Sequence, residues 1–498
     1  MEEKKNMDIC LVSPPGRAYN HYRPPMALLY LAAYLSSNNI NVSIIDPKSS
    51  LWVSTDSCKD EIISQIIKNI DDCKPRIVGI GCYTNEYMDV LNLAKRIKLH
   101  DSSIKIIVGG VHPTLKPQDL FFPGSPFDFI VIGEGEQTLY ELVKALKLGN
   151  SIQNIKGIAY FDNKNQQIVT NSPRPLLQDL DSLPFPDFRK IDMSYYTSPN
   201  PYAVRGVFLS AFYILITRGC PSSCTFCVNK NLREYSGGGQ YFRHRSAKNV
   251  LDELILLKKT YKIDGFYIID DAFTLKKELV EDICRGIIKN KLNLLWGCST
   301  KISAVTYDLL RIMKKAGCVQ IDFGVESGSD EILLKMKKGS TREQIKKAFK
   351  LCHDSKIRTF ANILINFPEE TRNNINETLT LLEEIKPEVT SFNIFIPYLG
   401  TDIYNQYSIN LAKEEYYKLG LSPLELINEP RFIFAKHDIN FKEFYAYNHK
   451  KFNKLFRFFA GNFNQRYLGT LLKSKRKSDY FKQLPVLLKE LLLQKNVK

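Results

Sequence analysis

Three cysteines close together in the chain give the sequence its strongest chemical signal. Cys220, Cys224 and Cys227 are spaced as C-x-x-x-C-x-x-C, and they follow a short apolar run at residues 213–217 that is typical of a buried strand. Each thiolate of such a set can bind one iron of a cubane iron–sulfur cluster. The fourth iron would then have no protein ligand and could bind another molecule.

A structural zinc site is the alternative for this array. Structural zinc takes four ligands, and no fourth cysteine or histidine lies near residues 220–227. We therefore predict the cluster, and with it a reducing, oxygen-poor setting. The other cysteines show no ligand spacing. Those in apolar runs are expected to be small buried side chains, namely Cys10, Cys82 and Cys318.

The region that must position the array, residues 211–405, alternates strands and helices at the spacing of a β/α barrel. The expected strands are 213–217, 265–269, 295–300, 320–325, 358–365 and 391–396. The expected helices are 247–261, 277–290, 306–316, 329–335, 342–355 and 371–385. These units predict a partial barrel. Because barrel enzymes place catalytic residues at the carboxyl ends of strands, the array lies where a site is expected.

Residues 7–150 also alternate strands and helices. The expected strands are 8–13, 41–46, 76–81, 104–110 and 127–133, and the expected helices are 27–35, 61–70, 87–98 and 136–146. This pattern predicts a doubly wound parallel sheet, whose ligands bind at the carboxyl ends of the strands. Glycine-containing loops follow several of these strands, whereas no G-x-G-x-x-G dinucleotide fingerprint follows the first.

The remaining pattern sets the expected domain borders. A β-hairpin is expected at residues 157–161 and 166–170. We place the first domain at residues 1–175, a linker at 176–210, the partial barrel at 211–405 and a helical, basic cap at 406–498. We expect the barrel-mouth loops and this cap to form the substrate pocket.

Composition and charge narrow the class of protein. The 498 residues are 44% hydrophobic and contain no apolar run long enough to cross a membrane. The amino-terminal residues lack the apolar core of a signal peptide, so we expect a cytoplasmic protein. The net charge is +16, and residues 431–498 hold sixteen Lys and Arg against four Asp and Glu.

Three interpretations fit this basic segment: a solvated helical face, a nucleic-acid site, or a contact with an anionic membrane surface or substrate. Interleaved Phe and Tyr favour a peripheral membrane contact over nucleic acid, since the sequence contains no recognised nucleic-acid module.

The cysteine array at the opening of a partial barrel, with Phe226 before its last cysteine, resembles the radical S-adenosylmethionine superfamily. In that family three cysteines hold a 4Fe-4S cluster, and the amino and carboxyl groups of S-adenosylmethionine chelate the open iron. One electron then cleaves the sulfonium and yields a 5′-deoxyadenosyl radical. The resemblance implies that Cys220, Cys224 and Cys227 are the cluster ligands and that Phe226 lies near the adenine.

The ends of the second and third expected strands resemble the same family. Residues 267–274 resemble the segment whose polar end helps to hold the methionine amino group. The resemblance gives that role to Asp270, while Asp271 would cap a helix. Residues 296–301 resemble the third strand, although Lys301 stands where an arginine is more usual. A solvated charge at the barrel rim is the alternative for Lys301.

The ends of the fourth and fifth expected strands also resemble the radical S-adenosylmethionine superfamily. Residues 323–329 resemble the family's fourth strand, and the resemblance implies that Glu326 contacts the ribose rather than only capping the next helix. Residues 366–371 resemble a G-x-P-G-E-T loop, but its two glycines are replaced by Asn366 and Glu369, which puts close backbone approach there in doubt. The implied S-adenosylmethionine contacts are Phe226, Asp270, Ser299, Lys301, Glu326 and Asn362.

Residues 26–35, 44–46, 109–114 and 133–136 resemble the cobalamin-binding domain that precedes the barrel in one branch of this superfamily. The branch contains class B methylases and a few cyclases and ring-rearranging enzymes. It lacks the D-x-H-x-x-G motif that supplies a histidine to cobalt, as does this chain, so we do not assign His112 to cobalt. The implied cobalamin contacts are Ser13, Thr84, Gly109, Gly110, His112, Thr114, Gly133 and Glu134. A tight strand-exit turn is the alternative for Gly109 and Gly110.

The sequence therefore predicts an α/β protein: a doubly wound, Rossmann-like cobalamin-binding domain, a partial (β/α)6 TIM-like barrel and a small helical C-terminal region. The favoured function is a cobalamin-dependent radical S-adenosylmethionine methyltransferase acting on an unactivated carbon or on phosphorus. The alternatives are a non-methylating cyclase or ring-rearranging oxidoreductase with the same cofactors, and a cluster- and cobalamin-binding protein without turnover. The expected partners are a small-molecule or lipid-like substrate and a flavodoxin- or ferredoxin-type electron donor, with no nucleic acid.

Overall fold

The computed structural model describes residues 7–15, 23–47, 59–407, 409–426, 429–436, 439–452 and 464–495. The chain divides into two compact units, each assembled from separate stretches of sequence. The first comprises Met1–Met193, Val228–Arg243 and Tyr398–Gly420. The second comprises Ser194–Cys227, His244–Pro397 and Leu421–Lys498.

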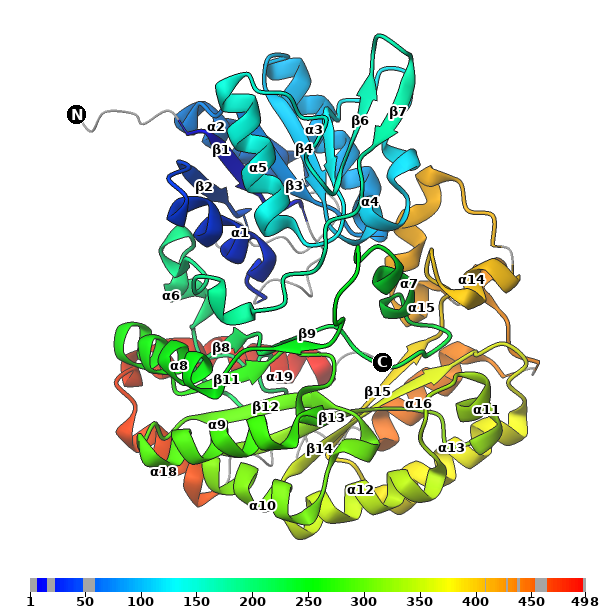
Figure 1. The fold of residues 1–498 in the computed structure, drawn as a ribbon. Coiled ribbons are helices and arrows are strands. Elements are labelled where there is room, and N and C mark those ends of the chain that lie inside the picture. The colour runs from blue at the N-terminus through cyan, green and yellow to red at the C-terminus, as the bar shows by residue number, and fades with distance from the viewer. Residues whose placement is uncertain are drawn as a thin grey trace. The chain divides into compact units, whose positions relative to one another are not determined.

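The first unit is built on a seven-stranded sheet in the order β2-β1-β3-β4-β5-β6-β7 (Figure 1). Its parallel strands are β1 (Ile9–Val12), β2 (Val42–Ile45), β3 (Ile77–Gly81), β4 (Lys105–Gly109) and β5 (Phe129–Val131). They confirm the predicted doubly wound sheet. The predicted hairpin is present as β6 (Ile158–Asp162) and β7 (Gln167–Thr170), and it extends the sheet because β6 pairs antiparallel to β5.

Helices cover both faces of this sheet. On one face α1 (Met26–Ser37) and α5 (Gly135–Leu148) pack together and join the strand side chains in a shared apolar core. On the other face lie α2 (Lys59–Cys73) and α3 (Tyr87–His100) (Figure 1). The shorter elements are η4 (Thr84–Glu86), α4 (Val111–Leu115), η5 (Pro117–Leu120), η6 (Leu180–Ser182), η7 (Phe188–Lys190), α7 (Asn229–Glu234), α14 (Asp402–Tyr407) and η10 (Lys413–Gly420).

The second unit contains a wholly parallel six-stranded sheet in the order β15-β14-β13-β12-β11-β8. Its strands are β8 (Ala211–Ile214), β11 (Gly265–Ile268), β12 (Leu295–Thr300), β13 (Cys318–Glu326), β14 (Arg358–Ile365) and β15 (Val389–Ile394). Each overlaps a predicted strand, although β8 shares only residues 213 and 214 with its prediction, and the sheet confirms the partial barrel.

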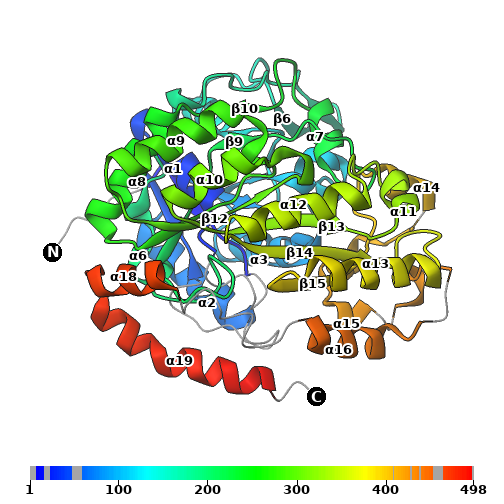
Figure 2. The same cartoon turned by 90° about the horizontal axis from the view of Figure 1, so that it is seen from below.

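The helices between these strands lie along one face of the sheet, as Figure 2 shows. They are α8 (Ala247–Tyr261), α9 (Lys277–Lys289), α10 (Tyr307–Ala316), α11 (Asp330–Lys335), α12 (Arg342–Asp354) and α13 (Arg372–Ile385). Four of them begin after a Ser or Thr whose hydroxyl accepts a backbone N–H of the first turn. These caps are Ser246, Thr306, Thr341 and Thr371. Because such caps fix where a helix begins, the predicted starts agree closely with the observed ones.

The C-terminal region is helical, as predicted. Its elements are α15 (Pro423–Leu426), η11 (Pro430–Phe432), α16 (Phe441–Phe452), α18 (Gln465–Lys473) and α19 (Lys477–Lys495). Other short elements near the barrel are α6 (Met193–Tyr196), β9 (Thr217–Arg218), β10 (Arg243–His244), η8 (Phe273–Leu275) and η9 (Ile302–Ala304). Among the helices that the structure describes, none is both long and apolar enough to cross a membrane.

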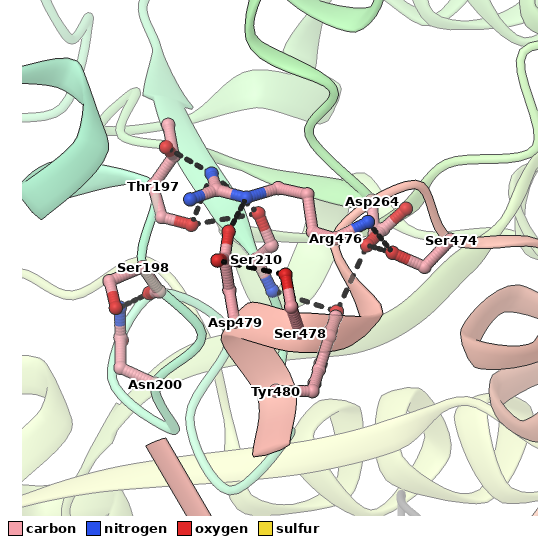
Figure 3. A network of polar contacts seen from close by, with 10 residues as sticks. All are labelled: Thr197, Ser198, Asn200, Ser210, Asp264, Ser474, Arg476, Ser478, Asp479 and Tyr480. Carbon is pink, nitrogen blue, oxygen red and sulfur yellow. Dashed lines mark hydrogen bonds and ion pairs between the residues drawn. The ribbon is translucent and has the colours of Figure 1, made fainter. Parts of the chain in front are cut away.

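The C-terminal chain is fastened to the amino ends of β8 and β11 (Figure 3). The hydroxyls of Ser474 and Tyr480 lie 2.6 and 3.1 Å from Oδ2 of Asp264, the residue before β11. The Tyr480 hydroxyl also accepts the backbone N–H of Ser210, the residue before β8, at 3.0 Å. This part of the C-terminal region therefore lies at the edge formed by the amino ends of the strands. We had expected the cap to help form a pocket at the other edge, formed by the carboxyl ends.

Arg476 completes this attachment (Figure 3). Its Nη1 donates to the backbone oxygen of Thr197 at 2.9 Å, and its Nε donates to Oδ2 of Asp479 at 2.6 Å. A guanidinium held by several acceptors in a partly buried place is a structural group. Arg476, one of the basic residues of the C-terminal region, therefore helps to hold this region to the barrel.

Candidate functional site

The carboxyl edge of the six-stranded sheet collects the residues that the sequence singled out. Glu326 is the last residue of β13, Ser299 and Asn362 lie within β12 and β14, and Asp270 and Lys301 closely follow β11 and β12. The cysteine loop follows β8 and β9. Since carboxyl ends of parallel strands meet at one edge, these positions share the edge at which such folds bind ligands.

The cysteine loop presents three partly exposed thiols, Cys220, Cys224 and Cys227. Within the described residues, no three His, Cys, Asp or Glu side chains gather closely enough to hold a single metal ion. A cubane cluster differs because each thiolate binds a different iron, so its ligands stand farther apart. Three thiolates, each on a different iron, are the ligand set that such a cluster takes.

The positive charges of two lysines influence the ionisation of a thiol in this loop. Burial raises the pKa of the Cys224 thiol, and the nearby Lys338 and Lys301 oppose that shift. Three thiolates concentrate negative charge, and cations close by offset it. The predicted contact of Lys301 with S-adenosylmethionine and its alternative as a solvated rim charge both stay predictions.

Asp270 fixes the start of the cysteine loop. It is almost fully buried, and its carboxylate accepts the backbone N–H groups of Ile216 and Thr217, both at 2.8 Å. Burial raises its pKa to about 7, against the opposing effect of these hydrogen bonds. Both oxygens are thus engaged by the backbone. The predicted contact of Asp270 with S-adenosylmethionine stays a prediction.

Ser299 belongs to a buried polar network that the sequence analysis missed. The Tyr267 hydroxyl lies 2.9 Å from the Ser299 hydroxyl and donates to Oδ2 of Asp322 at 2.8 Å. Nε2 of Gln320 donates to the other oxygen of Asp322 at 2.8 Å, and Arg358 donates to Gln320 at 2.8 Å. The available signal was polar residues at alternate positions of an otherwise apolar strand, which points them to the inner face of the barrel.

Glu326 has a left-handed backbone conformation, with φ 65°, where the pairing of β13 with β14 shifts register. Its carboxylate accepts a hydrogen bond from Nζ of Lys338 at 2.7 Å. Asn362 is partly exposed, and its Nδ2 donates to the backbone oxygen of Phe323 at 3.3 Å. Left-handed backbone in a non-glycine residue is uncommon and recurs at functional sites.

The two positions where the family pattern has glycine keep the backbone shape that glycine would give. Asn366 and Glu369 have φ 71° and 65°. The Asn366 carboxamide accepts the N–H groups of Phe434 and Ala435 at 2.9 and 3.2 Å, and it donates to the backbone oxygen of Phe432 at 2.5 Å. The C-terminal segment 432–435 is therefore bound at the carboxyl end of β14.

In the first unit, the predicted loops interlock at the carboxyl ends of β3, β4 and β5. The Thr114 hydroxyl donates to the backbone oxygen of Gly110 at 2.7 Å and accepts the N–H of Gly133 at 3.0 Å. Gly110 has φ 108°, and a Cβ there would lie 3.0 Å from the backbone oxygen of Cys82. The residue must therefore be glycine, which is consistent with a tight strand-exit turn and with a ligand cradle alike.

His112 is a buried part of the same loops. Its ring lies between those of Tyr87 and Tyr416, at centroid distances of 5.2 and 5.5 Å, and its Nδ1 is 3.3 Å from the Thr84 hydroxyl. Burial lowers its pKa to about 4, with Asp119 opposing. The imidazole is thus neutral near pH 7 and packs inside the protein.

The other predicted cobalamin residues have different surroundings. The Glu134 carboxylate is held by Arg243 through two hydrogen bonds of 2.9 Å. Such a two-point pair fixes the carboxylate. Ser13 is buried just after β1 and donates its N–H to Ile45, while Gly109 ends β4. Their contacts with cobalamin stay predictions.

Comparison with known families agrees with both units. The radical SAM superfamily model matches residues 214–382, and the B12 binding domain model matches residues 16–143. A radical S-adenosylmethionine methyltransferase of Kitasatospora setae, solved with tryptophan and an analogue of S-adenosylmethionine, has the same fold. Its TM-score is 0.65 at 19% identity, over 81% of this chain and 77% of that one.

Two curated relatives are similar to this chain over most of its length. An uncharacterized methyltransferase of Pyrococcus horikoshii is 31% identical over 411 residues, which are 81% of this chain and 84% of the relative. An anaerobic magnesium-protoporphyrin IX monomethyl ester cyclase of Rubrivivax gelatinosus is 28% identical over 390 residues, which are 77% of this chain and 66% of the relative. The chain belongs to the cobalamin-binding radical S-adenosylmethionine family. It is an enzyme whose cofactors are a 4Fe-4S cluster, S-adenosylmethionine and cobalamin.

Proposed function

We propose that this enzyme transfers a methyl group from S-adenosylmethionine to an unactivated carbon, or to phosphorus, in a small molecule. The observation that carries the proposal is the presence of both sites in one chain. An open-iron cysteine loop lies at the carboxyl edge of one sheet, and interlocked glycine loops lie at that of the other. The similarity to the methyltransferase relative of P. horikoshii covers 81% of this chain.

When bound, the cluster supplies the electron that cleaves S-adenosylmethionine, and cobalamin carries the methyl group. The chain holds and orients these groups. Cys220, Cys224 and Cys227 would hold the cluster. The Asp270 carboxylate fixes the loop at its start, and the backbone N–H of Thr225 donates to the oxygen of Met336 at 3.0 Å to fix it near its end.

S-adenosylmethionine and cobalamin would be held by two separate sets of residues. Glu326 and Phe226 are the proposed contacts for the ribose and the adenine, joined by Ser299, Lys301 and Asn362 for the rest of S-adenosylmethionine. Cobalamin would rest on the loops that carry Ser13, Thr84, Gly109, Gly110, His112, Thr114, Gly133 and Glu134. Gly110 and Gly133 there have φ 108° and 79°, a backbone conformation that shapes these loops and that glycine adopts without strain.

The inner face of the barrel indicates the kind of substrate. Along β14 and β15 the partly exposed positions alternate with buried ones and carry uncharged side chains. These positions are Asn362, Leu364, Ser391 and Asn393. Segment 432–435, held by Asn366, borders the same edge. We therefore propose a substrate whose reacting part is uncharged and forms hydrogen bonds.

A cyclase or ring-rearranging oxidoreductase with the same cofactors is the second candidate. The cyclase relative of R. gelatinosus favours it, because its similarity covers 77% of this chain. The two candidates differ in products, since a methyltransferase releases S-adenosylhomocysteine with each methylated product and a cyclase does not.

The electron donor and the location are part of the proposal. A flavodoxin- or ferredoxin-type protein, acting in the cytoplasm, would supply the electron. The net charge of +16 favours association with an acidic partner of this type.

A peripheral membrane contact through α18 and α19 is also proposed. Tyr467 and Tyr480 are buried, whereas Leu472 and Phe481 are 74% and 76% exposed. Exposed lysines accompany them at positions 473, 475, 477 and 482. Apolar side chains beside lysines suit an anionic bilayer surface. Sedimentation with anionic and with zwitterionic vesicles tests this, and equal recovery with both would contradict it.

The central experiment uses the full-length protein, reconstituted without oxygen with iron, sulfide and cobalamin. It is supplied with a reductant, S-adenosylmethionine bearing a deuterated methyl group, and a metabolite extract. The expected result is a product that carries the labelled methyl, together with equimolar S-adenosylhomocysteine. Formation of 5′-deoxyadenosine and an unlabelled product, without S-adenosylhomocysteine, would favour the cyclase instead.

A further inference from the structure

Lys338, which lies outside the sequence motifs, directs its ammonium to two residues expected at the nucleoside. Its Nζ is 2.7 Å from Oε1 of Glu326 and 5.8 Å from the ring centroid of Phe226. The lysine and glutamate side chains are 17% and 10% exposed. Burying both charges is costly unless they are paired in good geometry, so this pair occupies a specific place.

The backbone aims this side chain. After α11 the chain turns through Lys337, whose φ is 50°, and the N–H of Lys338 donates to the backbone oxygen of Leu333 at 3.1 Å. In the same turn, the backbone oxygen of Met336 accepts the N–H of Thr225 at 3.0 Å. The turn that carries Lys338 is therefore bound both to α11 and to the cysteine loop.

Gly324, two positions before Glu326 in β13, leaves room for the pair. A Cβ on Gly324 would lie 2.3 Å from Oε1 of Glu326 and 2.6 Å from Nζ of Lys338. A side chain at this position of β13 would therefore press on the two charged ends and shift them. The observed geometry of the pair depends on the space that the glycine leaves.

We propose that Lys338 is a positioning residue for the nucleoside half of S-adenosylmethionine. The ammonium holds Oε1 of Glu326. Among the described residues the carboxylate has this one hydrogen-bond partner, so Oε2 remains available as the acceptor for a ribose hydroxyl. Fixing one oxygen removes the rotamer freedom that the glutamate would otherwise lose on binding. This inference rests on the proposed S-adenosylmethionine site.

The test compares three ligands on the reconstituted full-length enzyme, by equilibrium dialysis without oxygen. The ligands are S-adenosylmethionine, 5′-deoxyadenosine, which has only the nucleoside, and methionine, which has only the iron-chelating groups. The variants are Lys338→Met, Glu326→Gln and the double variant. Lys337→Met is the matched control, because its side chain is exposed and adjacent. Iron content and far-ultraviolet circular dichroism verify that each variant is loaded and folded.

We expect Lys338→Met to weaken S-adenosylmethionine and 5′-deoxyadenosine by about tenfold or more, and methionine by less than about twofold. The double variant should be no weaker than Glu326→Gln alone, because the lysine acts through the glutamate. Lys337→Met should bind all three ligands like the unaltered protein. Lys338→Arg, which keeps the charge, verifies folding if the methionine variant fails to load its cluster, and it should retain more affinity.

Equal loss of methionine and nucleoside affinity would overturn the inference, because the lysine would then act on the cluster. Unchanged affinity for S-adenosylmethionine, or additive losses in the double variant, would also overturn it. If the unaltered, fully loaded enzyme binds no S-adenosylmethionine, the proposed function itself fails, and that result is separate from any effect of the variants.

Discussion

The side-chain oxygen of Asn366 accepts the backbone N–H of Phe434 at 2.9 Å, although 68 positions of sequence separate the two residues. The same carboxamide donates to the backbone oxygens of Phe432 and Phe395. The loop after β14 and segment 432–435 are therefore one structure at the carboxyl edge of the sheet. Farther along the C-terminal chain, Ser474 and Tyr480 are bound at the opposite edge of the sheet.

Replacing Asn366 with glycine should free this segment while preserving the backbone conformation. Glycine adopts the observed φ of 71° without strain, so the change isolates the lost hydrogen bonds. We expect a loss of about 1–3 kcal/mol in the free energy of unfolding. Product formation should fall more than 5′-deoxyadenosine formation. Urea unfolding and hydrogen exchange at Phe434 and Ala435 measure the effect.

The control is Asn376→Ala, which alters an exposed asparagine on α13. Unchanged exchange at Phe434 in the glycine variant would show that the carboxamide does not hold the segment.

Replacing Asp270 with asparagine should weaken the cysteine loop. The carboxylate accepts two backbone N–H groups at its start, and an amide can offer only one acceptor atom in its place. We expect less iron per protein after reconstitution. Asp271→Asn, on the exposed neighbour, is the matched control. Equal iron content in both variants would contradict the positioning role.

The same aspartate predicts a pH effect with a definite sign. Its pKa is raised to about 7 from an unfolded value near 4, so the folded state holds the proton more tightly. The stability it contributes is complete below about pH 4 and is lost as the pH rises through about 7, at up to about 1.4 kcal/mol per pH unit. Unfolding in urea from pH 5 to 7.5 should show this slope, and Asp270→Asn should flatten it.

Loss of any of the three loop cysteines should abolish cleavage of S-adenosylmethionine. Replacing Cys220, Cys224 or Cys227 with alanine leaves the cluster two ligands. The expected result is loss of the cluster's visible absorbance and no 5′-deoxyadenosine. Cys73→Ala, in the first unit, should retain both. Continued 5′-deoxyadenosine formation by a loop variant would remove that residue from the ligand set.

The strands and helices could be predicted because their signals are local. Apolar runs of strand length predicted the strands of the two large sheets. The contacts of Lys338 and Asn366 could not be predicted, because each joins segments far apart in sequence. The motif also gave Asp270 a ligand role, whereas its observed partners are backbone groups of a neighbouring strand end that no local pattern reveals.

Arg476 should matter for stability and not for chemistry. Its Nη1 and Nε bind Thr197 and Asp479 at the amino ends of the strands, away from the edge that carries the cysteine loop. Arg476→Met keeps much of the apolar stem and removes the hydrogen bonds, so we expect a loss of about 1–3 kcal/mol in the free energy of unfolding. Below its melting temperature the variant should form 5′-deoxyadenosine at the normal rate. Lys475→Met, which removes the same charge from an exposed neighbour, should leave both quantities unchanged. A variant of Arg476 with normal stability would mean that the attachment in Figure 3 does not contribute to folding.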